Sequence, residues 1–152
     1  MNSLSFAGLA VTDVTHAMQL ALGPVFLLNG VGVLLAMLTS RLSRIVDRAR
    51  VMEAELPNAP ASEGRLLLGR LRITSRRARL MNRAITLCTV AALLISLVVA
   101  LLFTSAFTPL PLTLAISLLF IVSMSSLVGA LWCFLIEVRI ATASLRIGPA
   151  VK

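Results

Sequence analysis

The pattern of hydrophobic and polar positions divides the chain into three long apolar runs and the polar segments around them. Residues 17–40, 84–107 and 110–136 contain no Asp, Glu, Lys or Arg. Each run exceeds the roughly 20 residues that an α-helix needs to cross the hydrocarbon core of a bilayer. The pattern therefore predicts an all-α membrane protein with three transmembrane helices, of which the third follows an outer turn within residues 108–136.

Residues 41–83, between the first two runs, keep the period of a helix with one apolar seam. Apolar or small residues recur three and four positions apart on both sides of Pro57 and Pro60, which is the spacing of one helix face. These seam residues are Leu42, Ile45, Ala49, Met52 and Leu56 before the prolines, and Leu67, Leu71, Thr74, Ala78 and Met81 after them. Because proline cannot continue a helix, we expect the first two transmembrane helices to extend into an antiparallel helical hairpin with its tip at residues 57–61.

The segments at the two ends of the chain are shorter. Residues 1–16 hold no Lys or Arg, so they lack the positive region of a signal peptide, and the first apolar run is expected to remain as a membrane anchor. Val11, Val14 and Met18 follow helical spacing, which indicates a short amphipathic helix leading into the first span. Residues 137–152 are expected to form a tail after the third span.

The basic residues all lie on one side of the predicted membrane helices. Of fourteen Lys and Arg residues, eleven fall within residues 41–83 and the other three follow the third run. The positive-inside rule then places the N-terminus outside, and the hairpin and the C-terminal tail in the cytoplasm. A hydrophobic content of 59% and a mean hydropathy of +0.99 are far above those of soluble proteins. The net charge of +8 therefore indicates lipid headgroups as the partner and not nucleic acid.

The supply of chemically reactive side chains is small. The chain has six acidic residues, one His and two Cys, and they are scattered. A metal site needs several ligands together, whereas His16 has only Asp13 nearby. We therefore expect no enzymatic activity, no metal and no cofactor. Cys88 and Cys133 are interpreted as free thiols that pack inside the spans.

Arginine accounts for thirteen of the fourteen basic residues, and its planar guanidinium suits phosphate and carboxylate groups. Six arginines form stripes along the predicted hairpin and are candidates for contact with anionic lipid headgroups or with an acidic cytoplasmic partner that the sequence does not identify: Arg41, Arg44, Arg48, Arg76, Arg79 and Arg83. Asp47 lies three residues from both Arg44 and Arg50, so it is expected to pair with them.

Glu137 is the one acidic residue next to the end of a predicted span. An acid at a membrane span is a functional candidate by default. At the boundary, however, it is expected to form a salt bridge with Arg83, Arg79 or Arg41.

Each predicted span also carries polar or small residues along one face. The stripes are Asn29, Gly32, Ala36, Thr39 and Ser43 in the first span, Asn82, Thr86, Thr89, Leu93 and Ser96 in the second, and Ser123, Ser126, Ala130, Cys133 and Glu137 in the third. Small residues let helices approach closely and hydroxyls bond across the contact, which indicates packing within the three-helix unit and between copies in a homo-oligomer. The alternative is an oligomeric channel for ions or small solutes, lined by Asn29, Thr86, Thr89 and Ser126.

Three segments of the chain resemble a bacterial membrane-protein family. They are Pro24-Val25-Phe26-Leu27-Leu28-Asn29-Gly30, then Arg41-Leu42 with Arg44-Ile45-Val46-Asp47-Arg48-Ala49-Arg50, and then Glu137-Val138-Arg139. The chain is similar over about residues 15–140 to the family catalogued as domain of unknown function twenty-seven twenty-one, whose members often have Asn where this chain has Ser40. The resemblance implies a small three-span protein of the bacterial inner membrane and supplies no activity or catalytic residue.

Overall fold

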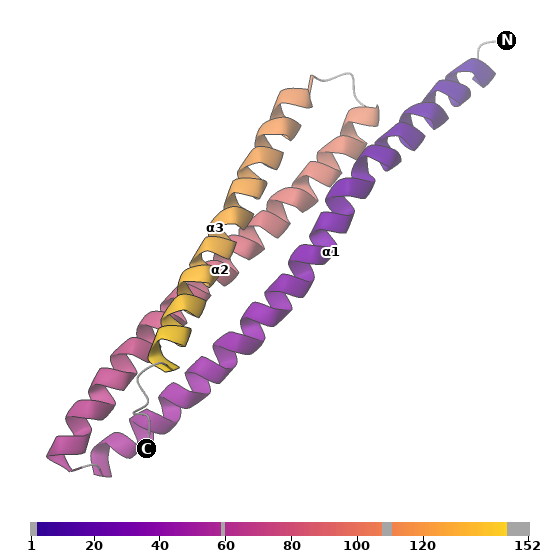
Figure 1. Ribbon diagram of the computed structural model, residues 1–152. Coiled ribbons are helices and arrows are strands. Elements are labelled where there is room, and N and C mark those ends of the chain that lie inside the picture. Colours follow the sequence, from indigo (N-terminus) through magenta and orange to yellow (C-terminus); the bar gives the residue numbers. More distant parts are fainter. Residues whose placement is uncertain (1–2, 59, 108–110, 146–152) are drawn as a thin grey trace. The chain divides into compact units, whose positions relative to one another are not determined.

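The computed structural model describes residues 3–58, 60–107 and 111–145, and side chains within residues 15–142 of this range. Every described element is a helix: α1 covers Ser3–Glu55, the short 3-10 helix η1 covers Leu56–Asn58, α2 covers Ala61–Phe107 and α3 covers Thr113–Leu145 (Figure 1). α1, α2 and α3 are each long and apolar enough to cross a membrane. A helix satisfies its backbone hydrogen bonds internally, as a bilayer requires. These observations confirm an all-α membrane protein with three membrane-spanning helices.

Apart from Ala17 and Ala21, the buried positions described in the three long helices recur at intervals of seven residues. They are Val31, Leu38 and Ile45 in α1; Met81, Cys88 and Ile95 together with Ala84, Ala91 and Val98 in α2; and Ser123, Ala130 and Glu137 in α3. A seven-residue period keeps one seam of a helix facing its neighbours, as in coiled coils and many membrane bundles. Many of these seam residues are small, which allows the helix backbones to approach closely.

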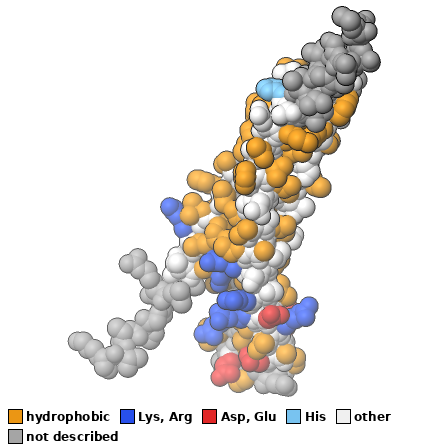
Figure 2. Space-filling view, turned by 90° about the vertical axis from the view of Figure 1, so that its right-hand side faces the viewer, with side chains coloured by type: hydrophobic (Ala, Val, Ile, Leu, Met, Phe, Trp, Pro, Cys, Tyr) orange, Lys and Arg blue, Asp and Glu red, His pale blue; other side chains and the backbone are white. Residues whose placement is uncertain are grey.

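The chain divides into two compact units. Unit 1 comprises Met1–Leu34 and Cys88–Leu127, and unit 2 comprises Leu35–Leu87 and Val128–Lys152. Unit 1 contains no Lys or Arg, so all the basic residues of the chain belong to unit 2. In the space-filling view the charged side chains gather together accordingly (Figure 2).

Unit 1 has a core of small and aliphatic side chains. Ala17, Ala21, Cys88 and Ala91 are at most 6% exposed. The Sγ atom of Cys88 lies 3.9 Å from the backbone oxygen of Val31, which brings α2 against α1 within this unit. Both cysteines of the chain are free thiols, and Cys88 is fully buried.

Unit 2 contains the Arg-rich segment, which we define as residues 41–83. In this segment α1 ends at Glu55, η1 follows, and α2 begins at Ala61 with the acid Glu63 in its first turn, where a negative charge favours the helix dipole. The ten seam residues identified from the sequence between Leu42 and Met81 are all buried or half-buried, whereas most positions between them are exposed. The seam is therefore the contact face of the segment.

Several sequence predictions concern residues that the structure does not describe. The apolar face through Val11 and Val14 lies outside the described side chains, although α1 includes both positions. Residues 108–110 of the outer turn and residues 146–152 of the expected tail also lie outside the described part, whereas residues 137–145, which were expected to belong to the tail, continue α3. Pro24 lies inside α1, which runs without interruption from Ser3 to Glu55.

Candidate functional site

A buried carboxylate in unit 2 joins all three long helices. Glu137 of α3 is 1% exposed. Arg77 of α2 donates two hydrogen bonds to its Oε1 atom, from Nε at 3.1 Å and from Nη2 at 2.8 Å. Arg41 of α1 approaches the other oxygen, with 3.8 Å between its Nη1 atom and Oε2. Removing a carboxylate from water is costly unless an opposite charge compensates it, and here two guanidinium groups do so.

Arg41 is held by an aromatic ring as well as by charge. Its guanidinium carbon lies 5.1 Å from the centre of the Phe134 ring, within the range of a cation–π contact. Phe134 and Glu137 are three residues apart on α3, so they share one face of that helix. The Arg41 side chain is still 49% exposed, whereas that of Arg77 is 23% exposed.

The Oε2 atom of Glu137 lacks a hydrogen bond. This atom is buried, and no described residue donates a hydrogen bond to it. Arg41 is the nearby cation, but its distance of 3.8 Å is too long for a hydrogen bond. The two oxygens of this carboxylate are therefore unequal. Oε1 is fully engaged by Arg77, and Oε2 is compensated only by the nearby positive charge of Arg41.

Most of the arginines named as candidate contacts take no part in this cluster. Arg44, Arg48, Arg76, Arg79 and Arg83 are exposed. In the described part of the chain the ion pairs are those of Glu137, so none of these five side chains is in one. Asp47 is exposed and pairs with neither Arg44 nor Arg50 within that part, so the expected local pairing is absent.

The partner that sequence reasoning missed is Arg77. The expected partners of Glu137 were Arg83, Arg79 and Arg41, and only Arg41 is close to it. A signal for Arg77 was present, because it precedes Ala84, Ala91 and Val98 by steps of seven on the buried face of α2. A charged residue at such a seam position needs a buried counter-ion.

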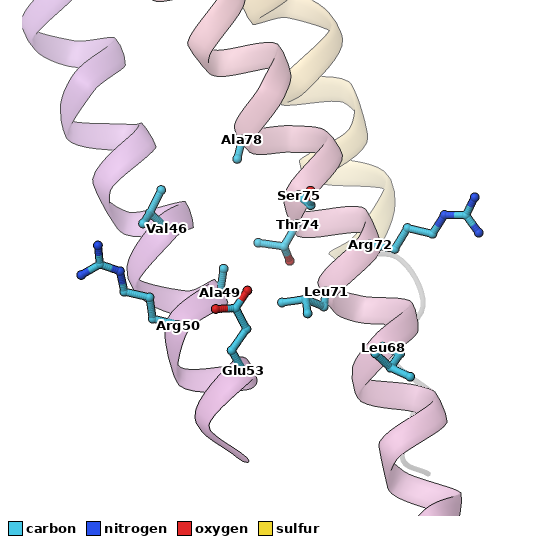
Figure 3. Close-up of a pocket in the computed structure, with 10 residues that line it drawn as sticks. All are labelled: Val46, Ala49, Arg50, Glu53, Leu68, Leu71, Arg72, Thr74, Ser75 and Ala78. Atoms are coloured by element: carbon cyan, nitrogen blue, oxygen red, sulfur yellow. The ribbon is translucent and has the colours of Figure 1, made fainter. Parts of the chain in front are cut away.

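A groove opens between the two helical arms of the Arg-rich segment (Figure 3). It has a volume of about 530 Å³, and its lining residues are Val46, Ala49, Arg50, Glu53, Leu68, Leu71, Arg72, Thr74, Ser75 and Ala78. Figure 3 shows Glu53 directed toward α2, while Arg50 and Arg72 point outward on opposite sides. The small side chains of Ala49 and Ala78 leave room for the groove. No group of three His, Cys, Asp or Glu that could hold a metal ion occurs among the side chains that the structure places.

The polar stripes of the three spans differ in where they face. In α1 every member of the stripe from Asn29 to Ser43 is exposed, and so is every member from Asn82 to Ser96 in α2. In α3 the corresponding residues are buried or half-buried. Only the α3 stripe therefore packs within the chain, and the α1 and α2 stripes face away from it.

Hydroxyl groups on the exposed stripes bond to their own helices. Thr39 donates to the carbonyl of Leu35, Thr86 to that of Asn82 and Ser96 to that of Ala92, each at 2.9 Å. The amide of Asn29 is exposed and has no hydrogen-bond partner within the described residues.

Among the four pore candidates, Asn29, Thr89 and Ser126 belong to unit 1 and Thr86 belongs to unit 2. Thr89 is exposed like Asn29, and Ser126 is half-buried.

Comparison with known proteins gives a family match. The model of the family described as Protein of unknown function (DUF2721) matches residues 21–147. No curated protein and no solved structure matches the chain. The matched range covers most of the sequence, including the Arg-rich segment and Glu137. This three-helix membrane protein therefore belongs to the family Protein of unknown function (DUF2721).

Proposed function

We propose that the protein is a non-enzymatic, homo-oligomeric component of the bacterial inner membrane whose Arg-rich hairpin lies in the cytoplasm and contacts anionic lipid headgroups. The observation that carries this proposal is the unpaired state of the exposed arginines. Residues 41–83 hold eleven Arg and four acidic residues. Among the described residues, Arg41 and Arg77 pair with an acid, and that acid is Glu137 from outside the segment.

The arithmetic of charge favours a lipid surface as the partner. The segment has a net charge of +7, from eleven positive and four negative side chains, beside a helix bundle that is apolar on its surface. Each basic residue close to an anionic membrane surface contributes about 1 kcal/mol of attraction. Because the positive side chains of this segment outnumber the negative ones, a net attraction to an anionic surface remains. An acidic protein partner would be attracted by the same charges.

The outward stripes support self-association. An amide such as that of Asn29 is costly to leave unpaired in a lipid environment, because no water is present to bond with it. A second copy of the chain can supply the partner. An added Cβ atom at Gly30 or Gly32 would meet nothing within 4 Å. These glycines are therefore not required by packing inside the chain and are free to allow close approach of another helix.

The experiment that tests the proposal measures the number of subunits and the class of phospholipid that stays bound. We expect the protein, purified in a mild detergent and examined by native mass spectrometry, to be an oligomer that retains anionic phospholipid in preference to zwitterionic phospholipid. Asn29→Leu should weaken the oligomer, whereas Ser117→Ala should not, because the Ser117 hydroxyl is already bonded to the carbonyl of Thr113. A monomer in several detergents and in nanodiscs would refute the oligomer, and equal retention of both lipid classes would refute the lipid contact.

A second candidate function draws on the same exposed stripes. If copies associate through Asn29 and Thr89, which are exposed in unit 1, these polar groups line a central channel for ions or small solutes. Solute flux into liposomes that contain the protein discriminates between the two functions. A channel predicts flux that Asn29→Leu abolishes, and a scaffold predicts no flux above that of empty liposomes.

A further inference from the structure

Arg79 and Arg83 are the two exposed arginines of α2 that lie nearest in sequence to its apolar run, which begins at residue 84. Both are exposed, and neither forms an ion pair or a hydrogen bond with any described residue. They are four residues apart, so their side chains project from one face of α2. Like charges at this spacing repel each other unless an anion lies between them. Arg41 and Arg77, by contrast, are already committed to Glu137.

Two contacts within unit 2 show which residues of α2 and α3 lie side by side along the helix axes, that is, at the same level. The first contact joins Arg77 of α2 to Glu137 of α3. The second involves Leu87, ten residues further along α2, which would lie 3.4 Å from a Cβ atom added to Gly129 of α3. Gly129 precedes Glu137 by eight residues, so the two helices run antiparallel in this unit. At 1.5 Å per residue, Arg83 is about 9 Å from the level of Arg77, and Trp132 is about 7.5 Å from that of Glu137 in the same direction.

Arg83 and Trp132 therefore lie at nearly the same level on different helices, and both face away from the bundle. Trp132 is 64% exposed and lies two residues from the buried Ala130. Arg83 is exposed and lies two residues from the buried Met81. Two residues turn a helix by about 200°, so each side chain is on the outer face.

This level has the properties of a membrane interface. Tryptophan is enriched where the headgroups meet the hydrocarbon, and arginine near a helix end reaches toward the phosphates. Counted back from Trp132 to the start of α3, the nineteen residues 113–131 span about 28 Å, close to the hydrocarbon thickness of roughly 30 Å, and the uncharged part of α3 continues to Ile136. The cluster of Glu137, Arg77 and Arg41 then lies on the aqueous side of the interface.

We propose that Arg79 and Arg83 form a phosphate-binding site for an anionic phospholipid of the surrounding bilayer. This inference rests on the proposed lipid contact and assigns it to two residues. The site requires an anion at the interface, because the chain supplies none there among its described side chains. The phosphate accepts hydrogen bonds from both guanidinium groups.

The test compares two double variants with the same loss of charge. Arg79→Gln with Arg83→Gln should reduce retention of phosphatidylglycerol about thirtyfold in native mass spectrometry, because two interfacial charges of about 1 kcal/mol each are removed. Arg65→Gln with Arg72→Gln on the same helix should change retention less than twofold. Arg72 lies eleven residues from Arg83, about 16 Å further from the interface and beyond a Debye length of roughly 8 Å. Thermal unfolding should be unchanged in the first variant, since both side chains are exposed and neither forms an ion pair or a hydrogen bond with a described residue.

The outcomes separate this site from the broader proposal. Equal losses in both double variants would show diffuse attraction and overturn the site, while leaving the lipid contact in place. If neither variant loses lipid, the site at Arg79 and Arg83 is overturned, and the lipid contact stands or falls with the preference of the unmodified protein for anionic over zwitterionic phospholipid. Displacement of phosphatidylglycerol by millimolar inorganic phosphate would show a site for free phosphate and overturn its assignment to a lipid.

The single tryptophan of the chain provides an independent measurement of depth. Fluorescence of Trp132 in nanodiscs should be quenched more by lipids brominated near the carbonyl end of the acyl chain than by lipids brominated near the chain terminus. Stronger quenching by the deep label would place Trp132, and Arg83 with it, inside the hydrocarbon and would overturn the assignment of the interface.

Discussion

At the scale of single residues, Glu137 is the side chain whose chemistry depends most on its neighbours. It is buried and bears a charge that Arg77 and Arg41 compensate from two other helices. A buried ion pair adds little net stability compared with apolar residues, yet breaking one is costly because the remaining charge is left alone. The structural value of the cluster is that it specifies which faces of the three helices meet in unit 2.

We predict that Glu137→Gln lowers the free energy of unfolding by about 2 kcal/mol, because Arg77 loses its counter-ion. The loss is smaller than for a fully buried pair, since the Arg77 side chain is 23% exposed. Unfolding of the helices in detergent mixtures, followed by circular dichroism, measures it. The matched control is the double variant Glu137→Leu with Arg77→Leu, which should lose less than Glu137→Gln alone. An equal or larger loss in the double variant would contradict the role of charge compensation.

At the scale of elements, the glycines of the membrane helices distinguish a helix face that packs inside the chain from a face that the chain leaves open. A Cβ atom at Gly129 of α3 would lie 3.4 Å from the Cδ1 atom of Leu87 on α2, whereas one at Gly32 of α1 would meet nothing within 4 Å. Gly129 therefore belongs to a contact inside the chain. Gly32 belongs to a face that the chain leaves open.

We predict opposite results for bulky substitutions at these two glycines. Gly129→Leu should destabilise the fold by about 1–3 kcal/mol, because overpacking at the contact with Leu87 forces the helices apart. Gly32→Leu should leave the unfolding transition of the isolated chain unchanged and should weaken self-association, measured by sedimentation in detergent. Gly129→Ala is the control, since its added methyl group reaches only ordinary van der Waals distance. A destabilised fold in Gly32→Leu would show that the α1 stripe packs within the chain.

The elements were more predictable from the sequence than the contacts between them. Apolar runs and spacings of three and four predicted the three membrane helices and the seam from Leu42 to Met81, because these patterns depend on helix geometry alone. The pairing of Glu137 with Arg77 was not predicted, because periodicity identifies a face of a helix but not its level against a neighbour. For the same reason the sequence showed stripes in all three spans but could not show that only the α3 stripe faces inward.

At the scale of the whole molecule, the distribution of charge determines the expected orientation. All basic residues belong to unit 2, and unit 1 has none. By the positive-inside rule we expect the Arg-rich segment in the cytoplasm and the start of α3 outside.

We predict that single cysteines report this orientation in a variant that lacks Cys88 and Cys133. Cysteine at Thr113, the first residue of α3, should react with a membrane-impermeant maleimide in intact spheroplasts. Cysteine at Gly64, near the start of α2, should react only after the membrane is permeabilised. Neither change disturbs packing, since Thr113 is exposed and an added Cβ at Gly64 meets nothing within 4 Å. The reverse labelling pattern would contradict the orientation.

The absence of basic residues from unit 1 also bears on how the protein reaches its membrane. In the proposed orientation, the segments that must be translocated during biosynthesis are residues 1–16 and the turn after α2. Their ionisable side chains are Asp13 and His16 alone. Insertion experiments assign about 3 kcal/mol to placing one arginine at the centre of a membrane helix. Residues 1–16 contain no arginine and so add no basic barrier to translocation, and we expect the arginines that follow each inward crossing to act as a stop.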